Sequence, residues 1–334
     1  MLLQALLPGV PPIEPLLLLV AALVLDAVVG DMRSLPGLRH PVVLIGAAVG
    51  WFDRRLNREY RSERDRARRG VLMVVLIVAA TAAAGLLVTW IAWTTAYGWA
   101  IELVLVAWLL AQRSLFNHVR AVRQALATEG LSAGRQAVSH IVGRDVRLLD
   151  EHGVARAAIE SSAENFNDGV VAPTFWYLLL GLPGLLIYKA VNTMDSMVGY
   201  RTPRFRAFGM AAARLDDGMN LVPARLAGLY LCLAAAFVPH ARPAAALGVM
   251  VRDARKHRSP NAGWPEAAAA GALGLALAGP RRYADTVIDD PWIGDGRSRA
   301  TPRDIDRALY LYAVACLVSL LVVGAVAAAR LGLQ

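Results

Sequence analysis

Long apolar stretches alternate with short charged segments along this chain, a pattern that predicts an all-α protein crossing a membrane several times. The clearest stretch, Ala308–Ala329, has 22 residues without a charged side chain. Because a helix rises about 1.5 Å per residue, this stretch is long enough to span about 30 Å of hydrocarbon. We therefore expect a polytopic integral membrane protein built from helices.

The stretch Val71–Gln112 is 42 residues long and contains one charged residue, Glu102. As a single helix it would reach about 60 Å, twice the thickness of the bilayer core. We therefore expect two helices joined by a turn at Thr94–Trp99. The membrane segments that we expect are Leu16–Val29, Val42–Phe52, Val71–Trp93, Trp99–Ala111, Val170–Tyr188, Leu221–Val238, Ala267–Ala278 and Ala308–Ala329.

The stretch Val170–Tyr188 contains helix-breaking residues. Pro173 lies near its start, and Gly181, Pro183 and Gly184 interrupt its middle. Broken helices occur at membrane depth only where protein or a cavity surrounds them. The pattern fits a re-entrant or broken helix, and it also fits a tilted span with a proline kink.

No internal repeat and no linker divides the chain, so we expect one membrane domain over residues 1–334. Within it, residues 113–169 are polar with helical spacing, which predicts a cytoplasmic helical insertion. Residues 281–307 are polar and interrupted by proline and glycine, which predicts an irregular loop.

Composition supports the membrane class. Hydrophobic residues make up 57% of the chain, against about 45–50% in soluble domains. The net charge of +9 comes largely from arginines beside apolar stretches; residues 53–69 alone hold eight arginines and four acids. Such segments are typical of cytoplasmic loops, and no basic–aromatic motif indicates nucleic-acid binding. The two cysteines lie in apolar stretches, which favours small buried side chains over a disulfide or a zinc site.

Polar residues that suit catalysis gather beside these apolar stretches. Glu160, Glu164 and Asp168 recur at helical spacing and would share one helix face, with Asn165 beside them. Carboxylates in a row repel one another, and oxygen ligands of this kind suit Mg²⁺. The alternative is a solvated acidic helix face.

A second polar segment follows Tyr188. Asn192 and Asp195 are one helical turn apart, and Arg201 comes after them. Carboxylates beside guanidinium groups suit a site that binds metal and phosphate together. The neighbouring Arg204 and Arg206 fit this site or a positively charged membrane anchor equally well.

A third polar segment contains Arg214, Asp216 and Asp217. Arg214 and Asp217 are three residues apart, so a simple ion pair is the alternative to a metal–phosphate site. Lys189, one of two lysines in the chain, could bind phosphate or extend to the membrane surface from a helix end.

Two further positions are candidates for substrate binding. Asn261 and Glu266 lie where an alanine-rich helix is expected to begin, and a helix N-terminus can bind an anion. His40 precedes Pro41 at the start of an apolar segment, where a structural role is the alternative. The chain has no P-loop, dinucleotide-binding, HExxH or GxSxG motif, so a nucleotide would be held by metal, carboxylate and arginine contacts.

Five long motifs follow one another along the chain: HPVVLIG at His40–Gly46, ESSAENFNDGVVAP at Glu160–Pro173, YKAVNTMDSMVGYR at Tyr188–Arg201, FGMAAARLDD at Phe208–Asp217 and SPNAGWPEAAAAGALG at Ser259–Gly274. In this order they resemble the adenosylcobinamide-phosphate synthase family of cobalamin biosynthesis (CobD/CbiB). The chain departs from the family pattern at Met32, Val43 and Phe166.

The resemblance implies an ATP-dependent ligase that joins adenosylcobyric acid to (R)-1-aminopropan-2-ol phosphate, or a related aminoalcohol, giving adenosylcobinamide phosphate. It implies ATP as co-substrate and a corrinoid and an aminoalcohol phosphate as substrates. The carboxylates indicate Mg²⁺ at the site, and the arginine-rich segments indicate the bacterial inner membrane with the active site facing the cytoplasm. A homo-oligomer and contacts with other corrinoid-pathway enzymes stay open.

The side-chain chemistry described above, rather than the resemblance, gives each candidate residue its role. We expect catalytic roles for Glu164, Asp168, Lys189, Arg201 and Arg214, substrate-binding roles for His40, Asn165, Asn192, Asn261 and Glu266, and metal-binding roles for Asp168, Asp195, Asp216 and Asp217.

Two other functions compete with this assignment. Buried acids and a broken helix are also typical of cation-coupled transporters, although no inverted repeat is visible. A CDP-alcohol phosphotransferase would also use Mg²⁺ in a membrane, but Asp168-Gly169 is followed at the expected arginine position by Pro173.

Overall fold

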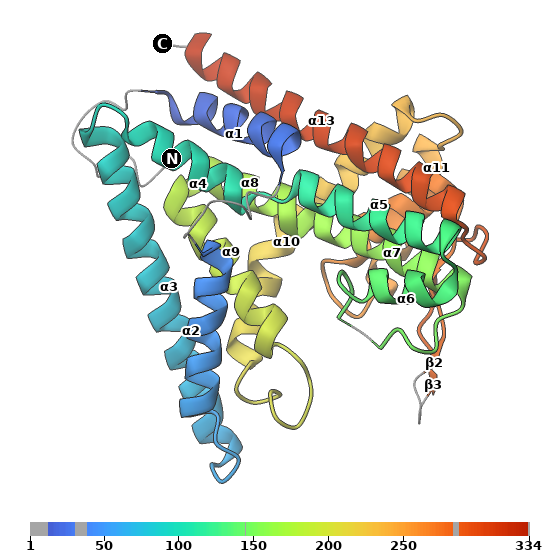
Figure 1. The fold of residues 1–334 in the computed structure, drawn as a ribbon, viewed down its shortest axis with the longest axis horizontal. Helices are drawn as coiled ribbons and strands as arrows, with labels where there is room; N and C mark the ends of the chain where they lie inside the picture. Colours follow the sequence, from blue (N-terminus) through green and yellow to red (C-terminus); the bar gives the residue numbers. More distant parts are fainter. Residues whose placement is uncertain (1–12, 31–38, 144, 283–286, 333–334) are drawn as a thin grey trace. The chain divides into compact units, whose positions relative to one another are not determined.

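The computed structural model describes residues 13–30, 39–143, 145–282 and 287–332. Within these ranges, helices account for nearly all of the regular structure (Figure 1). Four of them are long and apolar enough to cross a membrane: Glu63–Thr94, Gly98–Thr128, Met210–Phe237 and Pro302–Gly332. The predicted all-α, polytopic membrane class is confirmed. Met32, one departure from the family pattern, lies outside the described residues.

The chain forms two compact units. Unit 1 comprises Met1–Ala111, Ala172–Asn220 and Val323–Gln334, and unit 2 comprises Gln112–Val171 and Leu221–Val322. The predicted insertion at residues 113–169 thus shares its unit with a later part of the chain. The single domain over residues 1–334 stays a prediction.

Unit 1 is built around helices that pack side by side (Figure 1). Its buried core includes Val49, Met73, Tyr188 and Met194. The unit contains the first residues of α10 (Met210–Ala234), the end of α13 (Pro302–Gly332), and the helices α1 (Pro15–Val29), α2 (Pro41–Leu56), α3 (Glu63–Thr94), α4 (Gly98–Leu109), α8 (Ala172–Leu180) and α9 (Leu182–Val198).

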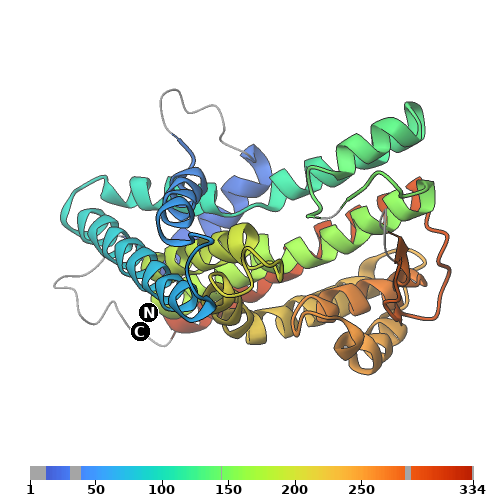
Figure 2. The same cartoon turned by 90° about the horizontal axis from the view of Figure 1, so that it is seen from below.

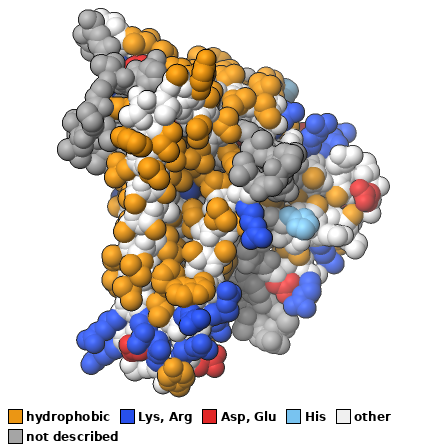
Figure 3. Space-filling view, turned by 60° about the vertical axis from the view of Figure 1, so that its left-hand side comes forward, with side chains coloured by type: hydrophobic (Ala, Val, Ile, Leu, Met, Phe, Trp, Pro, Cys, Tyr) orange, Lys and Arg blue, Asp and Glu red, His pale blue; other side chains and the backbone are white. Residues whose placement is uncertain are grey.

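The outward surface of α3 is apolar, as a lipid-facing helix requires. Val71, Leu72, Val75 and Leu87 are all exposed. Figure 3 shows apolar side chains covering this face, with Lys and Arg side chains gathered at the end where α2 is followed by α3. This end carries the arginine-rich segment at residues 53–69, so the charge lies at one end of the apolar surface.

Two predicted interruptions of the apolar stretches are confirmed. Helix α3 ends at Thr94 and α4 begins at Gly98, which matches the expected turn. Between α8 and α9, Gly181 has a φ of 71°, a left-handed conformation that ends α8 and that glycine adopts without strain. The predicted broken helix is therefore present, and its re-entrance into the membrane stays a prediction.

Unit 2 has a core rich in small side chains, including Ala155, Ala158 and Ala268. Helices α11 and α12, drawn in orange in Figure 2, pack closely because Gly271 presents no side chain to the backbone of Ala245. The unit contains the remainder of α10, most of α13, and α5 (Gln112–Thr128), α6 (Leu131–Val138), α7 (Glu151–Phe166), the π-helical turn η2 (Asn167–Val171), η3 (Ala235–Phe237), α11 (Pro243–Asp253), η4 (Ala254–Lys256) and α12 (Gly263–Leu273).

The end of unit 2 departs from two expectations. Ala267–Ala278 does not form a membrane helix, because Gly274, with a φ of 67°, ends α12. The region expected to be an irregular loop contains short antiparallel pairs instead. Strand β1 (Leu277–Ala278) pairs with β4 (Trp292–Ile293), and β2 (Arg281–Arg282) pairs with β3 (Val287–Ile288).

The close contact between α3 and α9 gives a test of the fold of unit 1. A Cβ atom at Gly85 would lie 2.6 Å from Pro183 Cα, so we expect Gly85→Ala to destabilise the protein by about 1–3 kcal/mol through overpacking. The matched control is Gly324→Ala, where a Cβ meets no atom within 4 Å. Thermal unfolding in detergent measures both, and an unchanged midpoint for Gly85→Ala would contradict this packing.

Candidate functional site

Helices α9 and α10 bring four polar side chains of unit 1 together, which we call the Asp216 cluster: Tyr188, Asn192, Asp216 and Asn220. The Tyr188 hydroxyl donates to Asn220 Oδ1 at 3.1 Å, and Asn220 Nδ2 donates to Asp216 Oδ2 at 3.0 Å. Asn192 Nδ2 donates to the other oxygen, Asp216 Oδ1, at 3.4 Å. Both carboxylate oxygens of Asp216 are therefore fixed by amide donors.

The sequence explains this cluster through helical spacing. Tyr188 and Asn192 are four residues apart on α9, and Asp216 and Asn220 are four residues apart on α10, so each pair lies on one helix face. Tyr188 and Asn220 are buried, whereas Asn192 and Asp216 are half-buried. The cluster thus runs from the core of unit 1 to an accessible carboxylate.

Asp195 lies one turn beyond Asn192 on α9 and is half-buried. Its backbone carbonyl accepts a hydrogen bond from Gly199 N at 2.7 Å, and a Cβ atom at Gly199 would collide with Asp195 Oδ1. Glycine at position 199 is therefore required for the position of this carboxylate. Lys189, also half-buried, lies one turn before Asn192.

The loop between α9 and α10 contains three arginines, Arg201, Arg204 and Arg206, of which the last two form ion pairs. Arg204 Nη2 pairs with Asp53 Oδ2 at 2.7 Å, and Arg206 pairs with Glu63. These two arginines tie the loop to the arginine-rich segment at residues 53–69, so they have structural roles.

Arg201 is exposed and interacts electrostatically with Asp217. Within the described ranges its guanidinium makes no hydrogen bond, so its donors are available to a ligand. Arg214 is likewise exposed on α10, and in the described part of the chain it forms no ion pair with Asp217. The simple pair that the spacing allowed does not form.

The donor set can be compared with what Mg²⁺ requires. No group of three or more His, Cys, Asp or Glu side chains in the described residues could hold a metal ion by itself. The carboxylates of Asp195, Asp216 and Asp217 belong to unit 1, whereas Asp168 belongs to unit 2. Mg²⁺ is commonly held by one or two carboxylates together with substrate phosphates. The residues present fit a cation bound together with phosphate rather than a closed protein cage.

The predicted acidic face of α7 does not form. Glu160 is buried, and its Oε1 accepts a hydrogen bond from Ala278 N at 2.8 Å, so it supports β1. Asp168 lies beyond the end of α7, within the π-helical turn η2, whose wider turn departs from α-helical spacing. Glu164 is exposed and Asp168 is half-buried, where Asn167 Nδ2 donates to Asp168 Oδ1 at 2.8 Å.

The remaining residues of this motif have local partners. Asn165 Nδ2 donates to Ser161 O at 2.9 Å and to Ser161 Oγ at 3.0 Å, within the same helix. Phe166 is fully buried and packs edge-on against Tyr312 with ring centroids 5.7 Å apart. The departure from the family pattern at Phe166 therefore fills the core of unit 2.

Asn261 and Glu266 lie at the start of α12 and are 5% and 3% exposed. Asn261 Oδ1 accepts from Arg225 Nη1 at 3.1 Å, and the Arg225 guanidinium stacks over Trp264 at 4.5 Å. Glu266 Oε1 lies 3.7 Å from His257 Nε2. Their burial supports a role in holding the first turn of α12, and contact with a corrinoid stays a prediction.

His40 has a structural role in unit 1. Its Nδ1 accepts from Val42 N at 3.2 Å, which caps α2, and its Nε2 lies 3.0 Å from Trp108 O. A neutral ring protonated on Nε2 satisfies both contacts. Substrate binding by His40 stays a prediction. The nearby departure from the family pattern, Val43, is exposed.

Asp253, at the end of α11, is a fully buried carboxylate that was not among the candidates predicted from the sequence. Arg252 Nη2 and Lys256 Nζ each lie 2.8 Å from it, and Gly294 N donates to Asp253 Oδ2 at 2.9 Å. The Arg252 guanidinium above all, with Lys256 and the Gly294 amide, holds the pKa of Asp253 well below its usual range. The charged residues around position 253 gave no signal that one of them is buried.

The fold and the Asp216 cluster define a helical membrane protein with a half-buried, amide-bound carboxylate beside exposed arginines. The profile of the CobD/CbiB protein family matches residues 19–312. The chain therefore belongs to the CobD/CbiB family.

Three relatives illustrate the similarity, and each bears the name cobalamin biosynthesis protein CobD. The protein of Brucella melitensis biotype 1 is 51% identical over 302 residues, covering 89% of this chain and 92% of its own. That of Sinorhizobium sp is 52% identical over 308 residues, covering 91% and 95%. That of Rhodobacter capsulatus is 47% identical over 314 residues, covering 93% and 96%. No solved structure matches the chain.

The contacts of Asp253 generate a prediction with a defined pH dependence. We expect Asp253→Asn to lower the free energy of unfolding by about 2 kcal/mol at neutral pH, because hydrogen bonds to a charged group are lost. The folded-state pKa is lowered, so this stabilisation is present above the unfolded pKa of about 4 and is lost as the pH falls through the folded pKa. Thermal unfolding from pH 7 to pH 3 should show a constant advantage of the wild type down to about pH 4 and a decreasing advantage below it.

The control is Asp306→Asn, which removes a partly exposed partner of Arg123. Exposed ion pairs contribute about 0–1 kcal/mol, so its effect should be smaller. Equal effects of the two substitutions at pH 7 would contradict the special role of Asp253.

Proposed function

We propose that this protein acts in cobalamin biosynthesis as an ATP-dependent ligase. It would join a propionate carboxylate of adenosylcobyric acid to the amine of (R)-1-aminopropan-2-ol phosphate, or of a related aminoalcohol, giving adenosylcobinamide phosphate. Family membership and the relatives' names support the pathway. The observation that carries the chemistry is the Asp216 carboxylate, fixed by Asn192 and Asn220 on α9 and α10.

The reaction needs an activated carboxylate. A corrinoid carboxylate oxygen attacks the γ-phosphorus of ATP, and ADP leaves. The amine nitrogen then attacks the acyl carbon, phosphate leaves, and the ammonium proton passes to a base. Mg²⁺, when bound with the nucleotide, would neutralise charge on the phosphate oxygens.

The candidate residues of unit 1 suit the binding of Mg·ATP and the transfer of its γ-phosphate. We assign Asp195, Asp216 and Asp217 to the metal–nucleotide, with Asn192 orienting Asp216. The exposed guanidiniums of Arg201 and Arg214 and the Lys189 ammonium would bind phosphate oxygens. In unit 2, we keep Asp168 as a metal ligand, Asn165 as its support and the exposed Glu164 as the base.

The ion pairs of the loop between α9 and α10 support a cytoplasmic position for the proposed Mg·ATP-binding residues. Arg204 and Arg206 tie the loop that carries Arg201 to the arginine-rich segment at residues 53–69. Arginine-rich segments stay on the cytoplasmic side of a bacterial inner membrane. Arg201 would therefore face the compartment in which ATP is available.

We expect Asp216→Asn and Arg201→Gln each to lower turnover by about a hundredfold or more, as loss of a fixed electrostatic group does. Arg206→Gln is the matched control from the same loop; it breaks the pair with Glu63 and should retain turnover. Detergent-purified protein is incubated with adenosylcobyric acid, Mg·ATP and the aminoalcohol phosphate, and amide product and ADP are quantified.

Two outcomes would contradict these assignments. Normal turnover by both Asp216→Asn and Arg201→Gln would show that neither residue binds the metal–nucleotide or its phosphates during the reaction. A folded wild-type protein that forms no amide product with phosphorylated or free aminoalcohol would contradict the ligase itself, and transport across liposomes would then be measured.

The orientation can be tested independently of activity. Tyr60 and Tyr97 flank α3 at opposite ends and are 82% and 81% exposed. In a background with Cys232 and Cys316 replaced by alanine, we expect Tyr60→Cys to react with a membrane-impermeant maleimide only in inside-out vesicles. Tyr97→Cys is the paired control and should react only in spheroplasts. The reverse labelling would place the arginine-rich segment outside the cytoplasm.

A further inference from the structure

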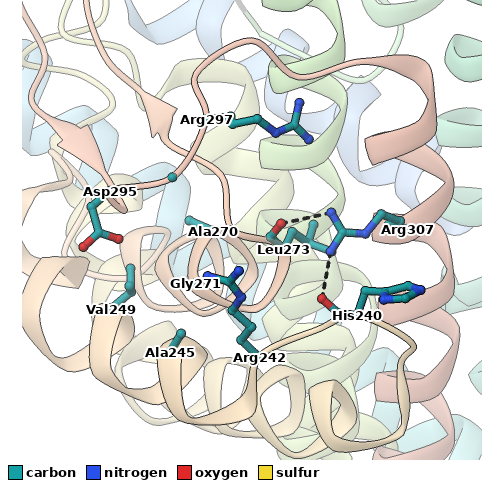
Figure 4. Close-up of a pocket in the computed structure, with 12 residues that line it drawn as sticks. His240, Arg242, Ala245, Val249, Ala270, Gly271, Leu273, Asp295, Arg297 and Arg307 are labelled. Carbon is teal, nitrogen blue, oxygen red and sulfur yellow. Dashed lines mark hydrogen bonds between the residues drawn. The ribbon is translucent and has the colours of Figure 1, made fainter.

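Unit 2 contains a cavity of about 480 Å³ that none of the candidate residues above line. Its walls come from the start of α11, the end of α12, the loop after β4 and the first turns of α13 (Figure 4). A volume in this range suits a small ligand.

Three arginines reach this cavity from separate segments of the chain: Arg242, Arg297 and Arg307 (Figure 4). The one acidic side chain that lines it is Asp295, which is bound by Arg252 at 3.1 Å. Asp304, behind the wall, pairs with Arg297 and Arg307. Counting both carboxylates and Arg252, positive charge still exceeds negative charge around the cavity, which favours an anionic ligand.

The arginines are held in place without using all of their donors. Arg307 Nη1 donates to Leu273 O at 3.0 Å and lies 3.4 Å from Asp304 Oδ1, and its Nη2 donates to His240 O at 3.2 Å. Arg297 Nη2 pairs with Asp304 Oδ1 at 2.8 Å. A guanidinium has five N–H donors, so both retain donors for a ligand. In the described part of the chain, the Arg242 guanidinium makes no hydrogen bond or ion pair.

The backbone around the cavity supports the same ligand. Carbonyls at the end of α12 would repel an anion, but Ala272 O accepts from Arg242 N at 3.0 Å and Leu273 O accepts from Arg307. The N-terminus of α11, where no side chain caps the helix, brings Ala245 to the wall. His240, also at the wall, has a φ of 60°, an uncommon conformation that occurs often at ligand sites.

We propose that this cavity is a binding site for a phosphate group, with Arg242 as its main ligand-facing donor. The location of this cavity near the ends of membrane helices means that the phosphate group could belong to a soluble compound or to a lipid. His240 follows the apolar helix that ends at Phe237, and Arg307 lies in the first turns of the helix that starts at Pro302, so the cavity adjoins the ends of two candidate membrane spans. A soluble phosphate compound and an anionic lipid headgroup share this chemistry. The proposal does not depend on the ligase reaction.

The test uses the full-length protein in nanodiscs and amide hydrogen exchange as a local readout. In phosphatidylcholine nanodiscs, we titrate inorganic phosphate and then pyrophosphate against a chloride control of equal ionic strength. We expect slower exchange in peptides covering residues 240–249 and 295–297. A second arm replaces phosphatidylcholine by phosphatidylglycerol, and protection there without added phosphate identifies a lipid as the source.

Two variants and one control make the readout specific. Arg242→Gln should weaken phosphate binding about tenfold, the usual effect of losing a charge-assisted hydrogen bond. Asp295→Asn should instead tighten it several-fold, because a negative charge leaves the wall; a merely structural role would not produce a gain. Arg120→Gln removes an exposed arginine of unit 2 outside the cavity and should leave binding unchanged.

Protection that disappears in Arg242→Gln and increases in Asp295→Asn supports the site in either arm. Absence of protection in both arms, or equal loss in Arg242→Gln and Arg120→Gln, overturns it. Amide synthesis is not the readout, so a failure here is distinguishable from a failure of the proposed ligase function.

Discussion

The structure depends on one constraint, the high cost of leaving a polar group without a hydrogen bond in an apolar environment. Glu102 shows this directly, since it is the single charged side chain in the 42 residues from Val71 to Gln112 and is 4% exposed. Tyr177 donates its hydroxyl to Glu102 Oε1 at 2.8 Å and thereby joins α8 to α4. Tyr188 similarly joins α9 to α10 through Asn220. Hydrogen bonds between buried polar groups thus connect helices of unit 1. They fix how these helices align with one another, which apolar packing alone would not do.

The same constraint gives the Asp216 cluster its chemical character. A half-buried carboxylate held by two amides has little freedom to move, so it is oriented before any ligand arrives. The neighbouring loop is closely packed, because Gly209 leaves no space for a side chain against Val198 and Gly199 leaves none against Asp195. Glycine at position 199 is therefore needed for the observed position of the Asp195 carboxylate.

Much of the fold could be predicted from the sequence because apolar length and helix breakers are local properties. The turn after Thr94 and the break at Gly181 followed directly from composition and spacing. The end of α12 did not, since an alanine-rich stretch continued past Gly274 and gave no sign that β1 would pair with β4. The prediction of an acidic face on α7 was wrong because of another contact between distant parts of the chain. Helical spacing predicted three aligned carboxylates, whereas Glu160 bonds to Ala278, which is 118 positions away in the chain.

The candidate site was likewise predictable only in part. Asn192 and Asp216 could be chosen from side-chain chemistry, but which arginine remains available required the contacts of Arg204 and Arg206 with a distant segment. The cavity lined by Arg242, Arg297 and Arg307 was not predictable, because its residues lie in three separated segments with no shared motif.

An isotope experiment can show whether this protein uses ATP to activate a corrinoid carboxylate for amide formation, as we propose. Adenosylcobyric acid with ¹⁸O in its carboxylates is converted with Mg·ATP and the aminoalcohol phosphate, and the released inorganic phosphate is examined by mass spectrometry. We expect one ¹⁸O atom in each phosphate released, because the carboxylate oxygen attacks the γ-phosphorus. Amide product accompanied by unlabelled phosphate would contradict it.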